Sequence, residues 1–452
     1  MRAKFMAMIT AMRGGSDEGV AGRNAIFAFA IRVASAGLAY LSQIILARWM
    51  GTYEYGIYAY VWVCLLMLGG FSTLGLNTAV IRFIPEYTEK CDLNRLRGLL
   101  FRSRLITFLT ATFLMGVSMA LLWGFKDHVQ SYVYLPALLV LICLPAYALT
   151  DLHDSMARAY GWMNMALIPP FLLRPLLILA VMLGFYMAGF PMTAVIAILA
   201  AVIATWLTSI VQILVLQPRL NREVPTGERQ DESRFWLKVA LPILLMESFV
   251  LFLQNSDVII LSQFHPPEDI AIYYAALKTI NLITFIHFAV SNAVANRFSA
   301  YQARGDKARL AAMVRQSVSW TFWPSLGAAV VLLALGQPLL WLFGPEFTAA
   351  YPVMFILAAG LVVKAMFGPA EYLLNMIGEQ KLCAMILFTT ALINILLNLI
   401  LIPLYGLIGA ATATALSLTL AALLFFIAIK WRLKINIFAF SSEGAKDEGQ
   451  NI

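Results

Sequence analysis

The sequence has few charged residues. Asp, Glu, Lys and Arg make up only 12% of its 452 residues, about half the share that soluble domains carry. Hydrophobic residues make up 61%, and the mean hydropathy is +0.81. A soluble fold could not bury so much apolar surface, so the composition excludes soluble, disordered and disulfide-framed secreted proteins. It predicts a polytopic membrane protein.

Cysteine and histidine are also scarce, with four residues of each. No cysteine spacing is typical of a metal site or a disulfide. The sequence lacks a Gly-rich phosphate loop of the P-loop type, and no predicted cytoplasmic segment is long enough for a nucleotide-binding domain. We therefore expect no cofactor and no ATP hydrolysis. The net charge of +8 comes from basic residues spread over many short loops, which argues against a nucleic acid partner.

Apolar runs of about 20–25 residues, the length that a bilayer crossing needs, occur twelve times in the sequence. We expect each run to be an α-helix, because a backbone exposed to lipid must satisfy its own hydrogen bonds. The fold class predicted is therefore all-α, with twelve transmembrane helices. The runs are 24–46, 56–80, 105–124, 134–156, 165–186, 193–216, 239–262, 271–295, 319–343, 352–375, 383–403 and 407–429.

The distribution of basic residues predicts the orientation of the chain. Of the 32 Lys and Arg residues, 26 fall in the terminal segments and in every second loop, whereas the alternate loops hold only Arg48 and Lys126. Cytoplasmic loops carry the excess of Lys and Arg. We therefore expect both termini and the loops at 81–104, 217–238 and 296–318 to be cytoplasmic.

The two halves of the sequence repeat at an offset of about 215 residues. Asn77 aligns with Asn292, and Arg82 aligns with Arg297. Each half holds six predicted spans, so both halves enter the membrane from the same side and the repeat is parallel. This predicts two six-helix bundles around a central cleft. The predicted divisions are a cytoplasmic segment at 1–23, bundles at 24–216 and 239–429, a cytoplasmic linker at 217–238 and a cytoplasmic tail at 430–452.

Three segments carry a family resemblance. Residues 47–58 read ARWMGTYEYGIY, residues 75–87 read GLNTAVIRFIPEY, and residues 394–411 contain NILLN followed by IPLYGLIGAA. On the basis of these segments, the chain resembles polysaccharide flippases of the O-antigen type. These belong to the multidrug/oligosaccharidyl-lipid/polysaccharide (MOP) exporter superfamily. The resemblance covers about residues 24–430.

The resemblance implies a multi-pass protein of the bacterial inner membrane that is a flippase and not an enzyme. Its substrate would be an undecaprenyl-pyrophosphate-linked oligosaccharide, such as a repeat unit of lipopolysaccharide O-antigen or of an exopolysaccharide. The resemblance also implies that the first, second, seventh and eighth spans line the cleft. Expected partners are the lipid bilayer, a polysaccharide polymerase and chain-length machinery.

Ionisable residues inside the predicted spans are candidates for function, because a charge in the bilayer is costly unless it faces the protein interior. At 100° per residue, Lys278, Asn281 and Asn292 fall within about 60° of one another, and Lys364 and Glu371 share another narrow face. A pyrophosphate requires cations. The residues predicted to bind the substrate are Arg32, Lys278, Arg174, Lys364, Asn77 and Asn292. The acids predicted to couple or gate transport are Glu247, Asp257 and Glu371.

Structural roles remain open for several of these residues. Arg174 could bond carbonyls freed by Pro175, and Lys364 could form a packing salt bridge with Glu371. Arg32 and Glu247 are 215 residues apart, the repeat offset itself, which suggests the hypothesis that they approach in one state of a transport cycle. The residues with the plainest structural interpretations are His287 (packing), Asn394 and Asn398 (hydrogen bonds between helices), Asp151, His153 and Asp154 (a solvated helix end), and Gly51, Gly56, Pro266 and Pro267 (helix ends).

Two other functions compete with the flippase. A multidrug or cation antiporter of the same superfamily would need carboxylates in the first bundle's cleft, yet the first span carries Arg32 and no acid. A membrane polysaccharide polymerase would need a sizeable loop or domain for its acceptor, and the longest predicted external loop has about nine residues. The internal repeat favours alternating access over chemistry at a fixed site.

Overall fold

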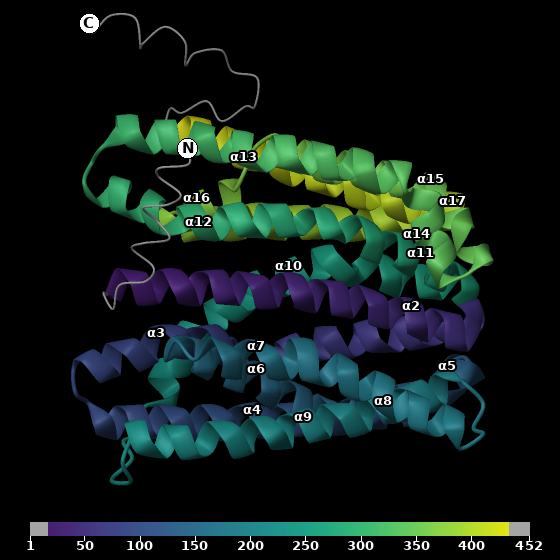
Figure 1. The fold of residues 1–452 in the computed structure, drawn as a ribbon, viewed down its shortest axis with the longest axis horizontal. Coiled ribbons are helices and arrows are strands. Elements are labelled where there is room, and N and C mark those ends of the chain that lie inside the picture. The colour runs from purple at the N-terminus through teal and green to yellow at the C-terminus, as the bar shows by residue number, and fades with distance from the viewer. Residues whose placement is uncertain (1–16, 434–452) are drawn as a thin grey trace, which may run out of the picture. The chain divides into compact units, whose positions relative to one another are not determined.

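Residues 17–433 are described by a computed structural model, apart from the side chains of residues 17–30, 32, 33 and 296. Within residues 17–433 every regular element is a helix, which confirms the predicted all-α class (Figure 1). Most of the predicted cytoplasmic segment at 1–23, and nearly all of the predicted tail at 430–452, lie outside the described residues. The described chain forms two compact units. The first comprises the chain up to Leu46 and Leu68–Leu244, and the second comprises Ala47–Met67 and the chain from Leu245 onward.

The first unit is a helical bundle. Helix α2 (Asp17–Ser72) begins in it, and α10 (Ser233–Phe264) starts there before continuing into the second unit. The elements between them are α3 (Leu76–Glu89), α4 (Leu93–Gly124), η1 (Lys126–His128), α5 (Ser131–Leu141), α6 (Leu144–Ala159), α7 (Met163–Ile168), the π-helical turn η2 (Pro169–Leu173), α8 (Arg174–Met187) and α9 (Ala194–Glu223).

The second unit is also a helical bundle. It holds the middle of α2 and most of α10. Its other elements are α11 (Pro267–Ile280), η3 (Asn281–Ile283), α12 (Thr284–Ala303), α13 (Lys307–Ala334), α14 (Gly336–Phe343), η4 (Pro345–Ala350), α15 (Tyr351–Ala365), α16 (Ala370–Met376) and α17 (Gln380–Leu433).

Among the described residues, nine helices are long and apolar enough to cross a membrane, and ten if the bent pair α5–α6 is one crossing. This is fewer than the twelve runs of the sequence, because two helices are unusually long. Helix α2 has 56 residues and α17 has 54. At about 1.5 Å per residue each would extend about 80 Å, more than twice the thickness of the hydrocarbon core. Each also contains a non-helical glycine, Gly51 (φ 74°) in α2 and Gly406 (φ 56°) in α17.

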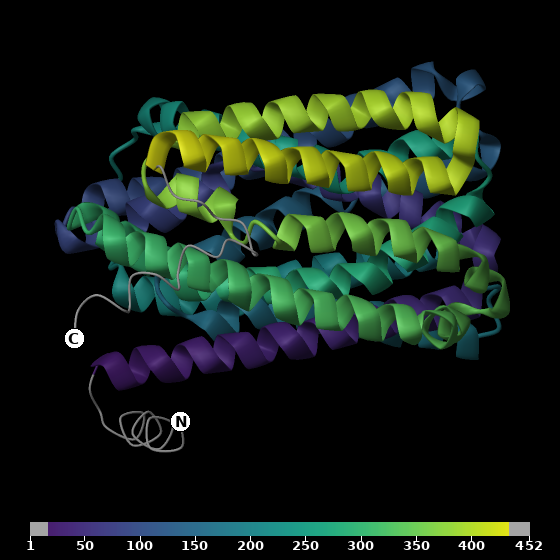
Figure 2. The same ribbon diagram turned by 90° about the horizontal axis from the view of Figure 1, so that it is seen from above.

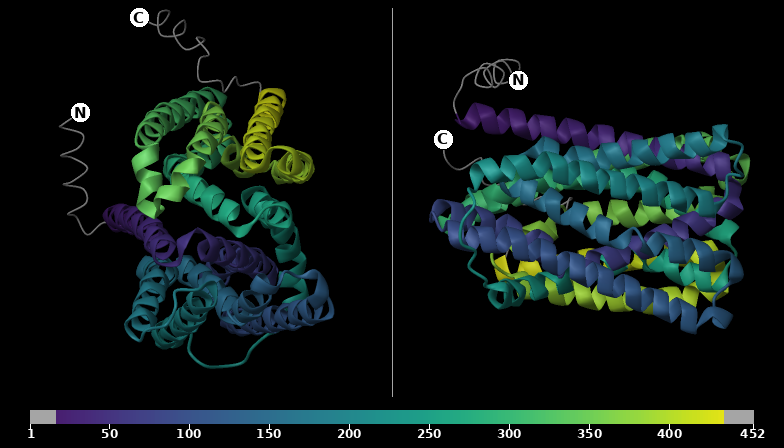
Figure 3. Two further views of the ribbon diagram at one scale, coloured as in Figure 1. Left: turned by 90° about the vertical axis from the view of Figure 1, so that its right-hand side faces the viewer. Right: turned by 90° about the horizontal axis from the view of Figure 1, so that it is seen from below.

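Helix α17 turns back on itself at Gly406. Figures 2 and 3 show its two yellow halves side by side. Asn394 in the first half donates to the Ser417 hydroxyl in the second half at 3.1 Å. Asn398 donates to the Asn394 side-chain oxygen at 3.1 Å, and Ser256 of α10 donates to the same oxygen at 2.6 Å. The prediction of hydrogen bonds between helices is confirmed for Asn394, which bonds to α10 and to the second half of α17, whereas Asn398 bonds to Asn394 within its own half.

Four predicted spans are not straight helices. The run at 134–156 bends by 47° between α5 and α6. The run at 165–186 contains the π-turn at Pro169 and Pro170, which cannot donate backbone hydrogen bonds. The run at 271–295 is interrupted by η3, and the run at 352–375 breaks between Ala365 and Ala370. Apolar length predicted where these spans lie, but it carries no signal for a break inside them.

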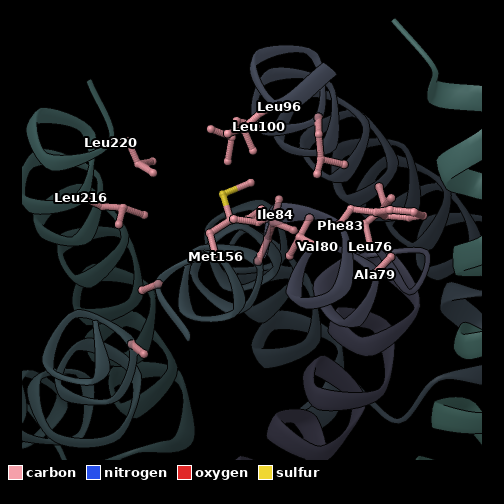
Figure 4. Packing of buried hydrophobic residues seen from close by; sticks show 14 of the residues in the cluster. Leu76, Ala79, Val80, Phe83, Ile84, Leu96, Leu100, Met156, Leu216 and Leu220 are labelled. Atoms are coloured by element: carbon pink, nitrogen blue, oxygen red, sulfur yellow. The ribbon is translucent and has the colours of Figure 1, made fainter. Parts of the chain in front are cut away.

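The core of the first unit shows how α3 packs. Leu76, Val80, Phe83 and Ile84 recur at helical spacing and are all buried. In Figure 4, Ile84 and Val80 lie on the side of α3 toward Met156 of α6, whereas Phe83 and Leu76 lie farther from it. Leu96 and Leu100 of α4 and Leu216 and Leu220 of α9 belong to the same core. At the edge of this core, the Trp236 indole N–H donates to the Tyr87 hydroxyl at 3.0 Å, so the buried ring is hydrogen-bonded.

Candidate functional site

The first unit contains a polar cluster on one face of α6, formed by Asn77, Tyr147, Asp151 and Arg174. Tyr147 and Asp151 are four residues apart on α6 and therefore share a face. The Asn77 amide donates to the Asp151 carboxylate at 3.0 Å. The Arg174 guanidinium lies 5.0 Å from the centroid of the Tyr147 ring. Two residues predicted to bind substrate are thus brought to one helix face, through α6 residues that were not predicted to do so.

Local backbone features position both predicted residues. Gly75 has φ 74° and precedes α3, so Asn77 lies in the first turn of that helix, where Thr73 donates to its side-chain oxygen at 3.2 Å. Arg174 begins α8 directly after the π-turn at Pro169–Leu173. Gly69 lies against the ring of Tyr147, and a Cβ there would come within 2.5 Å of it. The cluster therefore depends on a left-handed glycine, a glycine at a close contact and a proline-induced turn.

The prediction that Asp151, His153 and Asp154 form a solvated helix end is wrong. His153 is 2% exposed and Asp154 is 4% exposed. Asp154 accepts from Arg158 at 2.9 Å, and Asp151 accepts from Asn77. The reason is packing, because α3, α4 and α9 all contact α6 and cover this end of the helix. The sequence signal that could have found this is the i,i+4 spacing of Asp154 and Arg158.

The second unit encloses a cavity of about 90 Å³ lined by Lys364, Glu371 and His287 together with mostly apolar side chains. Lys364 is in the last turn of α15, Glu371 is in the first turn of α16, and His287 comes from α12. Within the described residues no ion pair joins Lys364 to Glu371, so the salt bridge considered for them is absent from this structure. A cavity lined by a cation, an acid and an imidazole has room for ordered water or part of a polar ligand. His287, interpreted from the sequence as a packing residue, is part of its lining.

The sequence correctly paired Lys364 with Glu371 but for the wrong reason. The predicted shared face assumed one unbroken helix, whereas the helix breaks between α15 and α16. Gly368 has φ 62° and its Cα lies against Val318, so that a Cβ would come within 2.8 Å of that side chain. The break, and not helical periodicity, brings both side chains to the cavity.

The predicted stripe on the eighth span is also interrupted. Asn281 begins the 3-10 turn η3, and Asn292 is exposed on α12. Because η3 changes the rotation per residue, the 100° rule no longer places these side chains on one face. Lys278 is partly buried, and its ammonium lies 4.6 Å from the centroid of the Tyr274 ring, a cation–π contact.

Asp257 is buried at 2% exposure and accepts three hydrogen bonds. Tyr273 of α11 donates at 2.5 Å, the Val258 backbone N–H donates at 2.8 Å, and Thr414 of α17 donates at 3.3 Å. The carboxylate therefore joins α10, α11 and the second half of α17. No basic side chain among the described residues forms an ion pair with Asp257, so these three donors are what offset its desolvation.

Arg32 and Glu247 remain predictions. The side chain of Arg32 is outside the description, and Glu247 is partly buried on α10. Arg32 belongs to the first unit and Glu247 to the second. That the two charges approach each other therefore stays a prediction from the sequence.

Comparison with known proteins places the chain in a family. Residues 21–302, more than half of the chain, match the polysaccharide biosynthesis protein family, and residues 242–400 match the MatE family. Over 400 residues the chain is 23% identical to an uncharacterized membrane protein of Methanocaldococcus jannaschii, a match that covers 84% of this chain and 78% of the relative. Over 162 residues it is 25% identical to the probable low-salt glycan biosynthesis flippase Agl15 of Haloferax volcanii. That match covers 36% of this chain and 34% of the relative.

Solved structures share the fold. The lipid II flippase MurJ in an inward closed conformation matches with a TM-score of 0.70 at 15% identity, over 90% of this chain and 87% of that one. An inward-facing multidrug resistance transporter of the MATE family matches with a TM-score of 0.69 at 14% identity, over 90% and 98%. The composition predicted a multi-pass membrane protein, and these structures agree with that prediction. The chain belongs to the polysaccharide biosynthesis protein family.

Proposed function

We propose that this protein is a flippase that moves a lipid-linked oligosaccharide across the membrane. The observation that carries the proposal is the match of residues 21–302 to the polysaccharide biosynthesis family. The local similarity to a probable glycan biosynthesis flippase agrees with it. Undecaprenyl pyrophosphate in a bacterial inner membrane is the carrier that the sequence resemblance implies, and the glycan would be a repeat unit of a surface polysaccharide.

The charges inside the spans suit an anionic substrate. Arg174, Lys278 and Lys364 are all partly buried, and two of them lie against tyrosine rings. A guanidinium or ammonium group can form charge-assisted hydrogen bonds with phosphate oxygens. We propose that these cations, with Arg32, contact the pyrophosphate during transport, and that Asn77 and Asn292 contact the polar part of the substrate.

We propose that the acids couple transport to an ion or to the membrane potential. Glu371 lines the cavity of the second unit beside Lys364 and His287, so a proton or cation arriving there would change the charge that Lys364 experiences. Asp257 and Glu247 are the further candidates. Alternating access of two repeat-related bundles is the transport mode that the repeat suggests.

A cation or drug antiporter is the second candidate. The match of residues 242–400 to the MatE family and the presence of Glu371 in an internal cavity favour it. Against it, the first-unit polar cluster holds one acid, Asp151, which already accepts a hydrogen bond from Asn77 and lies on the same helix face as the ring beneath Arg174.

Deletion of the gene in its source organism should separate the two functions. For a flippase, surface polysaccharide should fall and lipid-linked oligosaccharide should accumulate in the membrane fraction, since assembly continues while export stops. The measurement is mass spectrometry of extracted lipid-linked intermediates. Unchanged polysaccharide together with altered tolerance to cationic drugs would reject the flippase and support the antiporter.

The proposed topology has twelve crossings, with α2 and α17 each crossing twice and both termini cytoplasmic. Reporter fusions at Asp92 and Gly227 should report a cytoplasmic location, and a fusion at Asp127 should report the opposite side, because only the first two lie in Lys- and Arg-rich loops. The measurement compares alkaline phosphatase with green fluorescent protein activity at each site. A fusion at Gly227 that reports the external side would contradict the even number of spans in the first half.

A further inference from the structure

The first unit contains a second polar feature, a basic pocket of about 560 Å³ between the N-terminal part of α4 and the C-terminal end of α9. Arg97, Arg104 and Arg229 line it, with Gln217 and Asn221. No carboxylate is among its lining residues. None of these residues was predicted to be functional, because each was counted only as a loop charge or a polar helix end.

The pocket is built by defined contacts. Helices α4 and α9 both pack against α6, and Arg104 of α4 donates to the Gln217 side-chain oxygen of α9 at 2.6 Å. The 224–232 segment, which joins α9 to α10, closes one side. Arg97 donates to the Pro225 carbonyl at 2.6 Å, and Gln230 donates its backbone N–H to α4 at 3.0 Å.

A close backbone contact fixes the 224–232 segment further. Gly98 lies directly under the Gln230 carbonyl, and a Cβ at position 98 would come within 1.8 Å of that oxygen. The absence of a side chain there lets the segment lie on α4. The wall of the pocket is thus set by backbone contacts and by the Arg97 side chain, and does not depend on the side chains of Arg104 or Arg229.

Two neighbouring arginines at this end of the unit have acidic partners, whereas the three pocket arginines do not. Arg95 pairs with Glu232 at 2.9 Å, and Arg102 pairs with Asp231 at 2.6 Å. Hydrogen bonds from Ser233, together with the Arg102 guanidinium, lower the pKa of the Asp231 carboxyl, so it stays ionised and keeps Arg102 paired.

Among the described residues no acid forms an ion pair with Arg97, Arg104 or Arg229. The Nε atom of Arg104 is buried without an acceptor. The guanidinium of Arg229 lies 4.3 Å from the centroid of the Phe101 ring. Three unneutralised guanidinium groups around one pocket attract an anion, and the planar donors of arginine suit phosphate oxygens.

The position of the pocket along the helices suits an anion that carries apolar chains. Arg104 directly precedes the predicted span at 105–124, and Gln217 directly follows the predicted span at 193–216. Within the predicted spans both helices expose large apolar side chains. Leu109 of α4 is 56% exposed and Leu214 of α9 is 66% exposed. The pocket therefore lies where the charged surface of the unit meets its lipid-facing surface.

We propose that this pocket binds the phosphate head group of an anionic membrane phospholipid on the side predicted to be cytoplasmic, with the acyl chains on the apolar faces of α4 and α9. Basic pockets between transmembrane helices on that side are a known mode of recognition for anionic lipid head groups. The bound lipid would link α4 and α9 to the 224–232 segment. This role is independent of which substrate is transported.

The test is native mass spectrometry of the full-length protein purified in detergent and incubated with phosphatidylglycerol or phosphatidylcholine. Wild type should retain phosphatidylglycerol in preference to phosphatidylcholine. The triple variant Arg97→Gln, Arg104→Gln, Arg229→Gln should retain at least about tenfold less, since each charge-assisted hydrogen bond contributes about 1.5–3 kcal/mol. Arg229→Gln alone should weaken retention without disturbing the fold, because Arg229 makes only a ring contact among the described residues.

The matched control removes three exposed arginines of the second unit that are also predicted to be cytoplasmic, Arg297, Arg304 and Arg315. This variant has the same net charge as the pocket variant and should retain phosphatidylglycerol like wild type. Equal retention in the pocket variant and wild type would overturn the proposal, and so would equal retention of the two lipids. Displacement of phosphatidylglycerol by an equal concentration of inorganic phosphate would show a site for the free anion instead.

Discussion

Replacing Lys364 with methionine is expected to reduce glycan export about ten- to hundredfold, the effect of losing one charge-assisted hydrogen bond to a phosphate. Methionine is an unbranched side chain only one atom shorter than lysine, so packing around the cavity changes little, while the cation is lost. The substitution also leaves Glu371 in a small, mostly apolar cavity without the one ammonium group that lines it. Export would be measured as surface polysaccharide and as accumulated lipid-linked oligosaccharide, at equal amounts of protein in the membrane.

Two further variants separate transport from folding. Lys364→Met combined with Glu371→Gln removes both charges, and so avoids the cost of an unpaired buried carboxylate. The double variant should reach normal membrane levels and still fail to export, because it lacks both the proposed substrate contact and the proposed coupling acid, and normal levels exclude misfolding as the cause. Lys381→Met, at an exposed position on α17, is the control for loss of a lysine and should export normally. Normal export by Lys364→Met would show that the cavity of the second unit does not serve the substrate.

The second-unit cavity shows which features of a site could be predicted from the sequence and which could not. That Lys364 and Glu371 face the protein interior followed from the cost of charges in lipid. The cavity itself did not follow, because it depends on a helix break at Gly368 that apolar periodicity does not report. The same holds for Lys278 and Asn292, where η3 interrupts the expected face.

Residues whose role depends on distant packing were harder to predict. From the sequence, Asp151 was interpreted as part of a polar helix end, and only the tertiary contact with Asn77 of α3 makes it part of a partly buried cluster. Arg97, Arg104 and Arg229 were counted correctly as cytoplasmic charge, but the count does not distinguish the arginines that have acidic partners from those that do not. By contrast, the hydrogen bonds of Asn394 between helices were predicted correctly, because a polar side chain in an apolar span finds its partners on neighbouring helices.

Two glycines of α2 show how a role predicted from the sequence can differ from the role in the structure. Gly51 and Gly56 were both interpreted as helix ends. Gly51 has φ 74° and interrupts α2 as expected. Gly56 does not have a positive φ and lies inside the helix, so the prediction for it was wrong. Its role is to allow a close approach of two backbones, which a single sequence does not distinguish from a turn.

Replacing Gly56 with alanine should therefore destabilise the second unit severely. A Cβ at this position would lie 1.8 Å from the carbonyl oxygen of Pro267 and 2.5 Å from its carbonyl carbon. These are backbone atoms at the first residue of α11, and proline at that position restricts how the chain can move. Relief of the clash requires α2 and α11 to separate, which would also disturb the contact of Tyr55 with Tyr274. We expect a loss of about 3 kcal/mol or more, at the upper end of overpacking effects.

The control for this prediction is Gly327→Ala in α13 of the same unit. Nothing lies within 4 Å of a Cβ at position 327, and its φ is negative, so alanine should be neutral or should stabilise the helix by up to about 1 kcal/mol. The measurement is the thermal unfolding midpoint in detergent, followed by tryptophan fluorescence, together with the monodisperse fraction on size-exclusion chromatography. Gly56→Ala should lower both strongly, whereas Gly327→Ala should lower neither. An equal midpoint for the two variants would show that α2 and α11 are not held at the distance that this structure gives, and the close packing of Gly56 on Pro267 would have to be abandoned.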